Sequence, residues 1–180
     1  MINTMYIIGQ VMGFIALLFT VISFQCKKRE NILFYQIFCS IFYSLSLLFL
    51  GAITGALSMM ITIVRNFVFS QKGKKKWASH NAWLFIFLFI VIITGIITYK
   101  NLYSILPIIG TCLGTLAFWM TKPSHIRYIA VVIPPIWMIY NIAFGSIGGV
   151  ILESFYLLSV LTGIIRFDIL KQTDKENANI

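Results

Sequence analysis

The sequence predicts an all-α integral membrane protein in which seven transmembrane helices form two parallel three-helix repeats joined by a linker helix. Three observations support this fold class: seven long apolar runs, basic residues confined almost entirely to alternate connections, and a stretch of sequence that recurs 94 residues later. Of the 180 residues, 59% are apolar and 11% are charged. Soluble domains carry about 25% charged residues, so the composition excludes a soluble globular protein.

The seven apolar runs are each close to the length of a membrane-spanning helix, about 17–25 residues. Hydropathy alone would merge the second run with the third, and the sixth with the seventh. Glycine-rich turns at 51–55 and 145–149 divide them. The runs are residues 2–24, 32–50, 52–69, 82–99, 103–120, 126–144 and 147–167. A count of six spans is the alternative.

The formal net charge of +9 is distributed unevenly along the chain. Lys100 is the only basic residue in one set of connections, whereas the alternate connections and the C-terminal tail hold Lys27, Lys28, Arg29, Lys72, Lys74, Lys75, Lys76, Lys122, Arg127, Lys171 and Lys175. Basic loops collect on the cytoplasmic side of a membrane. The distribution therefore predicts an outside N-terminus and a cytoplasmic C-terminus, and it assigns the charge to topology rather than to nucleic-acid binding.

An internal repeat accounts for the order of the helices. Phe24, Lys28, Ile32, Gly51, Ile53 and Gly55 recur without a gap as Phe118, Lys122, Ile126, Gly145, Ile147 and Gly149. The pattern predicts a first three-helix bundle at 1–70, a basic loop and linker helix at 71–100, a second bundle at 101–170 and a disordered polar tail at 171–180. Because the fourth helix adds one crossing, the two bundles have the same orientation, as in sugar transporters of the SWEET type.

Several stretches resemble the YgjV-type bacterial inner-membrane proteins. The most specific are Gly145-Ser146-Ile147-Gly148-Gly149 with Glu153 and Ile164-Ile165-Arg166-Phe167; the others are Gln10-x-x-Gly13-x-Ile15-Ala16, Leu50-Gly51 with Gly55-Ala56, Arg65, Leu106-Pro107-x-Ile109-Gly110-Thr111 and Asn141. The resemblance covers most of residues 5–170 and implies a multi-pass protein of the bacterial cytoplasmic membrane. Its layout is similar to that of the SWEET, PQ-loop and KDEL-receptor group, although this chain has no Pro-Gln pair.

Glu153 is the only acidic residue within a predicted span. An ionisable group at that depth costs several kcal/mol on insertion scales, at least about 2.5, so it is expected to face protein or a water-filled cavity. We interpret it as a proton-coupling carboxylate or a hydrogen-bond acceptor for a substrate. The alternative is a structural carboxyl group bonded to a neighbouring helix.

Asn141 and Gln10 are expected at a similar depth to Glu153. Asn141 lies one turn before the second glycine turn, and Gln10 lies in the outer third of the first run. The three polar residues could line a chamber for a substrate. Equally, the two amides could hydrogen-bond neighbouring helices and hold the bundle together.

Arg65 is the cationic counterpart in the third run, with Asn66 beside it. A long side chain near a helix end can extend to the membrane interface. The alternative is contact with an anion or carboxylate at the inner gate, because the guanidinium fork suits bidentate binding.

Two further groups of residues complete the candidate site. Pro107, Pro134 and Pro135 are candidate hinges, because proline interrupts the hydrogen bonds of a helix. Trp137 aligns with Tyr43 across the repeat, and the pair could clamp a substrate, although lipid-facing aromatic belts account for most such residues.

The sequence thus predicts a small-solute transporter or facilitator that works by alternating access between the two bundles. A membrane receptor of the same fold, which binds a ligand without moving it, is the alternative. No nucleophile–base pair, histidine cluster or metal-ligand spacing occurs, so neither an enzyme nor a cofactor or metal site is expected. The expected partners are the lipid bilayer and an unidentified solute, and a homo-oligomer remains open.

Overall fold

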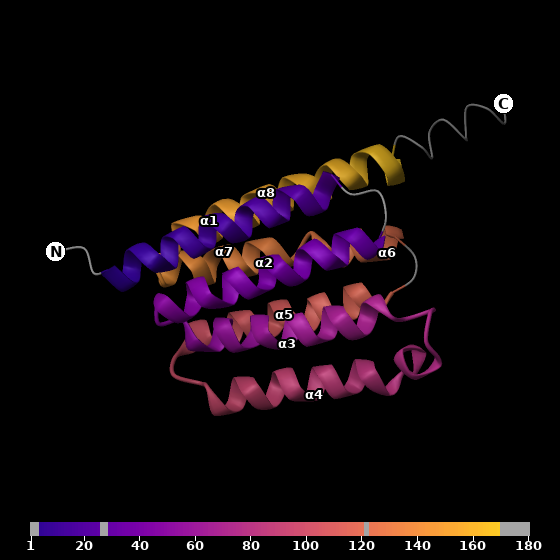
Figure 1. Ribbon diagram of the computed structural model, residues 1–180, viewed down its shortest axis with the longest axis horizontal. Helices are drawn as coiled ribbons and strands as arrows, with labels where there is room; N and C mark the ends of the chain where they lie inside the picture. Colours follow the sequence, from indigo (N-terminus) through magenta and orange to yellow (C-terminus); the bar gives the residue numbers. More distant parts are fainter. Residues whose placement is uncertain (1–3, 26–28, 121–122, 170–180) are drawn as a thin grey trace.

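The computed structural model describes residues 4–25, 29–120 and 123–169, and every regular element in them is a helix (Figure 1). The α-helices are α1 (Thr4–Gln25), α2 (Arg29–Phe49), α3 (Ile53–Ser70), α4 (Ala82–Ile97), α5 (Ile105–Trp119), α6 (Pro123–Ala130), α7 (Ile133–Ala143) and α8 (Ile147–Ile164). Short 3₁₀ turns lie at η1 (Lys76–Ser79) and η2 (Leu102–Ser104), and η3 (Ile165–Ile169) is a π-helical turn. The predicted tail at 171–180 lies outside the described residues.

The all-helical membrane prediction is confirmed at the level of length and hydropathy. Five helical stretches are long and apolar enough to span a bilayer: Thr4–Ser23, Ile53–Ser70, Leu102–Trp119, Ser124–Ala143 and Ile147–Ile169. Two more apolar helices, Leu33–Phe49 and Ala82–Ile97, have fewer than 18 residues. Spanning by these two, and hence the count of seven spans, stays a prediction.

The sixth apolar run is broken in two at the proline pair. α6 ends at Ala130, and α7 begins at Ile133, immediately before Pro134 and Pro135. These prolines have no N–H group to donate to the carbonyl groups one turn earlier, so the helical ladder stops there. Pro107, in contrast, lies in the first turn of α5, where helix N–H groups lack intrahelical partners and proline is tolerated.

The two glycine turns have the same backbone hydrogen bonds. Between α2 and α3, the N–H groups of Leu50, Gly51, Ala52 and Ala56 donate to the carbonyls of Ser46, Leu48, Leu47 and Ala52. Between α7 and α8, the N–H groups of Phe144, Gly145, Ser146 and Val150 donate to Tyr140, Ile142, Asn141 and Ser146. Each bond of the second set lies 94 residues after its counterpart. Gly51 (φ 76°) and Gly145 (φ 64°) adopt the left-handed conformation that this helix ending requires.

Six helical segments close into a ring around the centre of the bundle. α1 packs on α2, α2 on α3, α3 on α5, α5 on α7, α7 on α8, and α8 returns to α1. α4 lies outside this ring against α3 and α5, at the edge of the bundle in Figure 1. The ring is therefore made by α1, α2, α3, α5, α7 and α8, with α4 as a peripheral helix.

The contact between α1 and α8 brings two helix backbones together. A Cβ atom added to Gly148 would lie 3.0 Å from the carbonyl carbon of Gly13 and 3.1 Å from its Cα atom. Neither atom belongs to a flexible side chain that could move away. Small residues at such a contact let helices approach closely where lipid offers no hydrophobic drive for association.

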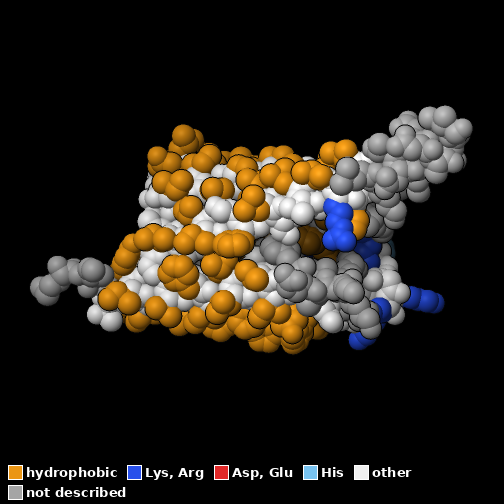
Figure 2. Space-filling model, turned by 90° about the horizontal axis from the view of Figure 1, so that it is seen from above, with side chains coloured by type: hydrophobic (Ala, Val, Ile, Leu, Met, Phe, Trp, Pro, Cys, Tyr) orange, Lys and Arg blue, Asp and Glu red, His pale blue; other side chains and the backbone are white. Residues whose placement is uncertain are grey.

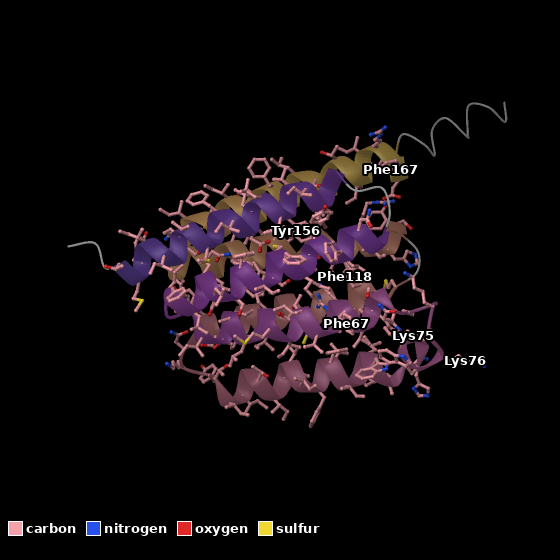
Figure 3. All side chains as sticks on the ribbon, in the orientation of Figure 1. Phe67, Lys75, Lys76, Phe118, Tyr156 and Phe167 are labelled. Carbon is pink, nitrogen blue, oxygen red and sulfur yellow. The ribbon has the colours of Figure 1, made fainter. Side chains whose placement is uncertain are left out.

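The outer surface is apolar along the helices and basic at one end. Figure 2 shows hydrophobic side chains along the sides of the bundle and lysine and arginine side chains gathered at one end. Lys75 and Lys76 project there from the connection between α3 and α4 (Figure 3). Lys100 lies in the connection between α4 and α5, at the opposite end (Figure 1).

The basic end also carries an ion pair between α6 and η3. The Nε atom of Arg127 donates to Asp168, 2.7 Å away. The Arg166 guanidinium instead lies over the ring of Phe167. Asp168 therefore joins η3, the last helical segment that the structure describes, to α6.

The α1–α8 contact makes a testable prediction about stability. The substitution Gly148→Ala is expected to lower the free energy of unfolding by about 1–3 kcal/mol, because the added methyl group forces the two backbones apart. Thermal unfolding of the purified protein in detergent measures the effect. Gly163→Ala in the same helix is the matched control, since its Cβ would meet one side-chain atom, Cδ of Arg127, at 3.1 Å and no backbone atom of another helix. Equal melting temperatures for both variants would contradict the prediction.

Candidate functional site

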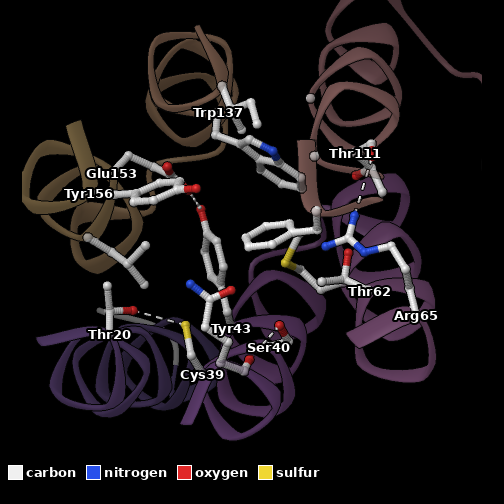
Figure 4. A pocket seen from close by; sticks show the side chains of 17 residues that line it. Thr20, Cys39, Ser40, Tyr43, Thr62, Arg65, Thr111, Trp137, Glu153 and Tyr156 are labelled. Atoms are coloured by element: carbon white, nitrogen blue, oxygen red, sulfur yellow. Dashed lines mark hydrogen bonds between the residues drawn. The ribbon is translucent and has the colours of Figure 1, made fainter. Parts of the chain in front are cut away.

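A cavity of about 90 Å³ lies at the centre of the helix ring (Figure 4). Every helix of the ring contributes to its wall, whereas the short α6 and α4 contribute nothing. The lining residues are Thr20, Gln36, Cys39, Ser40, Tyr43, Met59, Thr62, Arg65, Gly110, Thr111, Gly114, Phe118, Ile133, Trp137, Leu152, Glu153 and Tyr156. A space of this size holds a few water molecules, each of which needs about 10–15 Å³.

The cavity wall contains residues that are related by the same 94-residue spacing. Five pairs of lining residues have it: Thr20 and Gly114, Cys39 and Ile133, Tyr43 and Trp137, Met59 and Glu153, and Thr62 and Tyr156. Residues that lie 94 positions apart in the sequence thus face one space. The residues differ in all five pairs, so the wall is chemically asymmetric.

A buried hydrogen-bonded chain joins Asn141, Tyr43 and Glu153. The Asn141 amide nitrogen donates to the Tyr43 hydroxyl oxygen, and that hydroxyl donates to Glu153 over 3.4 Å. The same amide nitrogen donates to the carbonyl of Trp137 at 2.8 Å. Glu153 is 4% exposed and Asn141 is fully buried. These hydrogen bonds connect α7, α2 and α8 and hold the Glu153 carboxyl group at the cavity wall.

Asn141 fits because Gly149 has no side chain. A Cβ atom at Gly149 would lie 2.2 Å from the Asn141 side-chain oxygen. That oxygen is buried and has no hydrogen-bond partner among the described residues. The second glycine turn therefore also makes room for a polar residue of the site.

Arg65 lies on the opposite side of the cavity from Glu153 (Figure 4). Its side chain is only 3% exposed, so it turns into the bundle and does not extend to the membrane interface. The guanidinium donates to Asn66 Oδ1 at 3.1 and 3.3 Å, to Thr115 Oγ1 at 3.1 Å and to the Thr111 carbonyl at 3.5 Å. It also lies 5.4 Å from the centre of the Phe118 ring.

Tyr43 and Trp137 form the aromatic part of the wall. Both side chains are 2% exposed, so neither faces lipid, and their ring centres are 5.9 Å apart. Trp137 also packs on Gly110, where a Cβ atom would lie 2.5 Å from the indole nitrogen. The two aromatic residues predicted as a clamp are therefore neighbours that border the cavity together.

Gln10 and the three prolines lie apart from the lining residues. The Gln10 amide donates to the Gly145 carbonyl at 2.7 Å and accepts from the Gly148 N–H at 3.3 Å. Gln10 thereby joins α1 to the turn before α8. Pro107 and Pro134 are buried at the starts of α5 and α7, and Pro135 is exposed.

Three polar or aromatic groups of the site were missed from the sequence alone. Thr111 and Thr115 lie one helical turn apart on α5, and both contact Arg65. Tyr156 lies one turn after Glu153 on α8 and lines the same cavity, inside the bundle (Figures 3 and 4). The 94-residue spacing could have indicated Tyr156, because it aligns with Thr62. Among the described residues, no three His, Cys, Asp or Glu side chains are grouped to hold a metal.

Comparisons with known proteins show which family the chain resembles. The family model Imp-YgjV, described as a bacterial inner membrane protein, matches residues 7–171. Inner membrane protein YgjV of Escherichia coli (strain K12) is 25% identical over 168 residues, which cover 91% of this chain and 86% of that protein. No solved structure matches the chain. The two matches confirm the resemblance inferred from the glycine turn, Glu153 and their neighbours.

The hydrogen-bonded chain makes a second testable prediction. Tyr43→Phe removes the hydroxyl that connects Asn141 to Glu153 while it keeps the ring. The variant is expected to unfold at a lower temperature, with a loss of about 0.6–2 kcal/mol, because interhelical hydrogen bonds in membranes have this strength. Tyr99→Phe, at a side chain that is 58% exposed, is the control. A Tyr43→Phe protein that melts together with the control would contradict the assignment.

Proposed function

The chain belongs to the Imp-YgjV family of bacterial inner membrane proteins, and we propose on this premise that it is a transporter or facilitator of a small solute. The observation that carries the proposal is the central cavity, which lies between α1–α3 and α5–α8 and holds a buried carboxyl and a buried guanidinium group. Ionisable residues inside membrane proteins are costly and typically line substrate or ion pathways. The proposal assigns this cavity to solute binding rather than to catalysis.

In the proposed architecture, α1–α3 and α5–α8 are parallel repeats and α4 is the linker between them, a 3+1+3 layout like that of SWEET proteins. Three observations support it. The two glycine turns have matching hydrogen bonds, the ring is closed by α1 with α8 and by α3 with α5, and residues 94 positions apart share the cavity wall. Parallel repeats of this kind surround a substrate site near the middle of the membrane.

The proposed mechanism is alternating access, in which the two repeats rock against each other around the cavity. The break between α6 and α7 at Pro134 and Pro135 supplies a joint in the second repeat. α2, which occupies the corresponding place in the first repeat, is continuous from Arg29 to Phe49. The second repeat is therefore the one expected to bend.

The proposed orientation places the basic end of the bundle in the cytoplasm and the start of α1 outside. Lys72, Lys74, Lys75 and Lys76 follow α3 at that end, whereas Lys100 alone lies in the connection after α4. This asymmetry is the one that directs membrane insertion. Arg65 then lies in the cytoplasmic half of the bundle, and Asn141 lies nearer the outside.

A proteoliposome assay tests the proposal directly. Purified protein is reconstituted, and uptake is screened with radiolabelled sugars, amino acids, nucleosides and organic acids under solute and proton gradients. Saturable uptake above that of empty liposomes is expected for one class. Binding without passage of any solute under any gradient would instead support the receptor of the same fold.

Glu153 is proposed to couple a proton to this transport. It is the one acidic side chain that the structure describes at the cavity, and it accepts a hydrogen bond from a neutral hydroxyl, that of Tyr43. In Glu153→Gln, proton-driven accumulation is expected to disappear, while exchange of labelled for unlabelled solute continues. The measurement is uptake with and without an imposed pH gradient. Accumulation by the variant that still follows the pH gradient would refute the coupling role without touching the transport proposal.

A further inference from the structure

We propose that the Arg65 side of the cavity binds the carboxylate group of a small organic acid in its monoanionic form. The inference names the substrate class for the transport function proposed above and rests on that function for its physiological meaning. The binding site itself depends only on the residues around Arg65. It predicts that the solute is negatively charged, a property that the family match does not specify.

The first support is the electrostatic state of Arg65. Two carboxylates have described positions: Asp168 pairs with Arg127, and Glu153 bonds to Tyr43. The hydrogen-bond acceptors of Arg65 are all neutral, namely Asn66, Thr111 and Thr115. A guanidinium that is 3% exposed is costly within a membrane unless an anion or water accompanies it. The cavity is where such an anion can reach it.

The second support is a set of hydrogen-bond donors without partners beside Arg65. The Thr111 hydroxyl and the Asn66 amide nitrogen are both buried and have no hydrogen-bond partner among the described residues. Thr111 lines the cavity together with Arg65. A carboxylate has two oxygen atoms with several lone pairs, so it can accept bonds from a guanidinium and a neighbouring hydroxyl at once.

The third support is the shape of α5 next to the guanidinium. A Cβ atom at Gly114 would lie 3.3 Å from Arg65 Nη1, and a Cβ atom at Gly110 would collide with Trp137. Both glycines line the cavity, so α5 adds no side chain of its own to the wall at these two positions. Phe118, Trp137 and Tyr43 supply apolar surface for the remainder of a small acid.

The charges favour a monoanion over a dianion. Arg65 supplies one positive charge, and the neighbouring groups are neutral donors. Glu153 lies across the cavity, so a second negative charge on the solute would approach a carboxyl group. A solute with a single carboxylate at Arg65 and an uncharged remainder avoids this repulsion.

The test measures binding to the purified full-length protein in detergent by isothermal titration calorimetry and by thermal shift. The probes are acetate, propionate and benzoate, their amides acetamide, propionamide and benzamide, and inorganic phosphate. At least one carboxylate is expected to bind and to raise the melting temperature, and its amide is expected to bind at least about 10-fold more weakly, because hydrogen bonds to charged groups are the stronger ones. Equal binding of acid and amide, no binding of any carboxylate, or preferential binding of phosphate would overturn the inference.

Variants then locate the binding. Arg65→Gln is expected to weaken carboxylate binding at least about 10-fold, and Arg65→Lys by less, because lysine keeps the charge without the planar guanidinium. Arg166→Gln removes the same charge from an exposed side chain outside the cavity and is expected to bind as the wild type does. Unchanged affinity in Arg65→Gln would overturn the inference. Should that variant fail to fold, Thr111→Val keeps the shape without the hydroxyl, and unchanged affinity there would overturn it as well.

The same probes separate this inference from the transport proposal. If carboxylates bind and the binding requires Arg65, but no solute crosses the membrane of proteoliposomes, the site is supported and transport is refuted. Uptake of a neutral solute that Arg65→Gln leaves unchanged would support transport and refute the site.

Discussion

A guanidinium and a carboxyl group inside a lipid-embedded helix bundle must find their partners in the protein or in a cavity, because hydrocarbon offers none. This constraint organises the centre of the molecule. Glu153 is held by Tyr43, which is held in turn by Asn141. Arg65 is held by Asn66 and by two threonines of α5. The helix ring is thus connected across its middle by polar groups, while its outer surface is apolar.

Close approach of the helices makes these polar contacts attainable. Gly148 allows α8 to lie against the backbone of α1, and Gly149 leaves room for Asn141. On α5, Gly110 leaves room for Trp137 of α7, and Gly114 leaves room for Arg65 of α3. Replacing any of these glycines with a larger residue would separate a pair of groups that hydrogen-bond or pack over short distances. The glycines and the polar residues therefore form one interdependent set.

Positions 94 residues apart share backbone geometry at the two glycine turns but differ in chemistry at the cavity wall. Gly51 and Gly145 end their helices with the same hydrogen bonds. At the cavity wall, however, Met59 corresponds to Glu153 and Thr62 corresponds to Tyr156. A symmetric wall would place like charges opposite each other, whereas this one has a carboxyl group on one side and a guanidinium on the other. The two sides of the cavity therefore differ in charge, and a solute with one charged end can bind in one orientation.

The linear pattern of residues determined the helical class, the glycine turns and the break at Pro134, because hydropathy, left-handed glycine and proline act on neighbours in the chain. It also identified Glu153, Arg65, Asn141, Tyr43 and Trp137 as candidates by type and depth. It could not decide which way each side chain turns, since a helix places residues of the same depth on different faces. Only the tertiary structure joined Asn141 to Glu153 through Tyr43, turned Arg65 inward onto Thr111 and Thr115, and engaged Gln10 at the α7–α8 turn. These outcomes depend on packing between helices that lie far apart in the sequence.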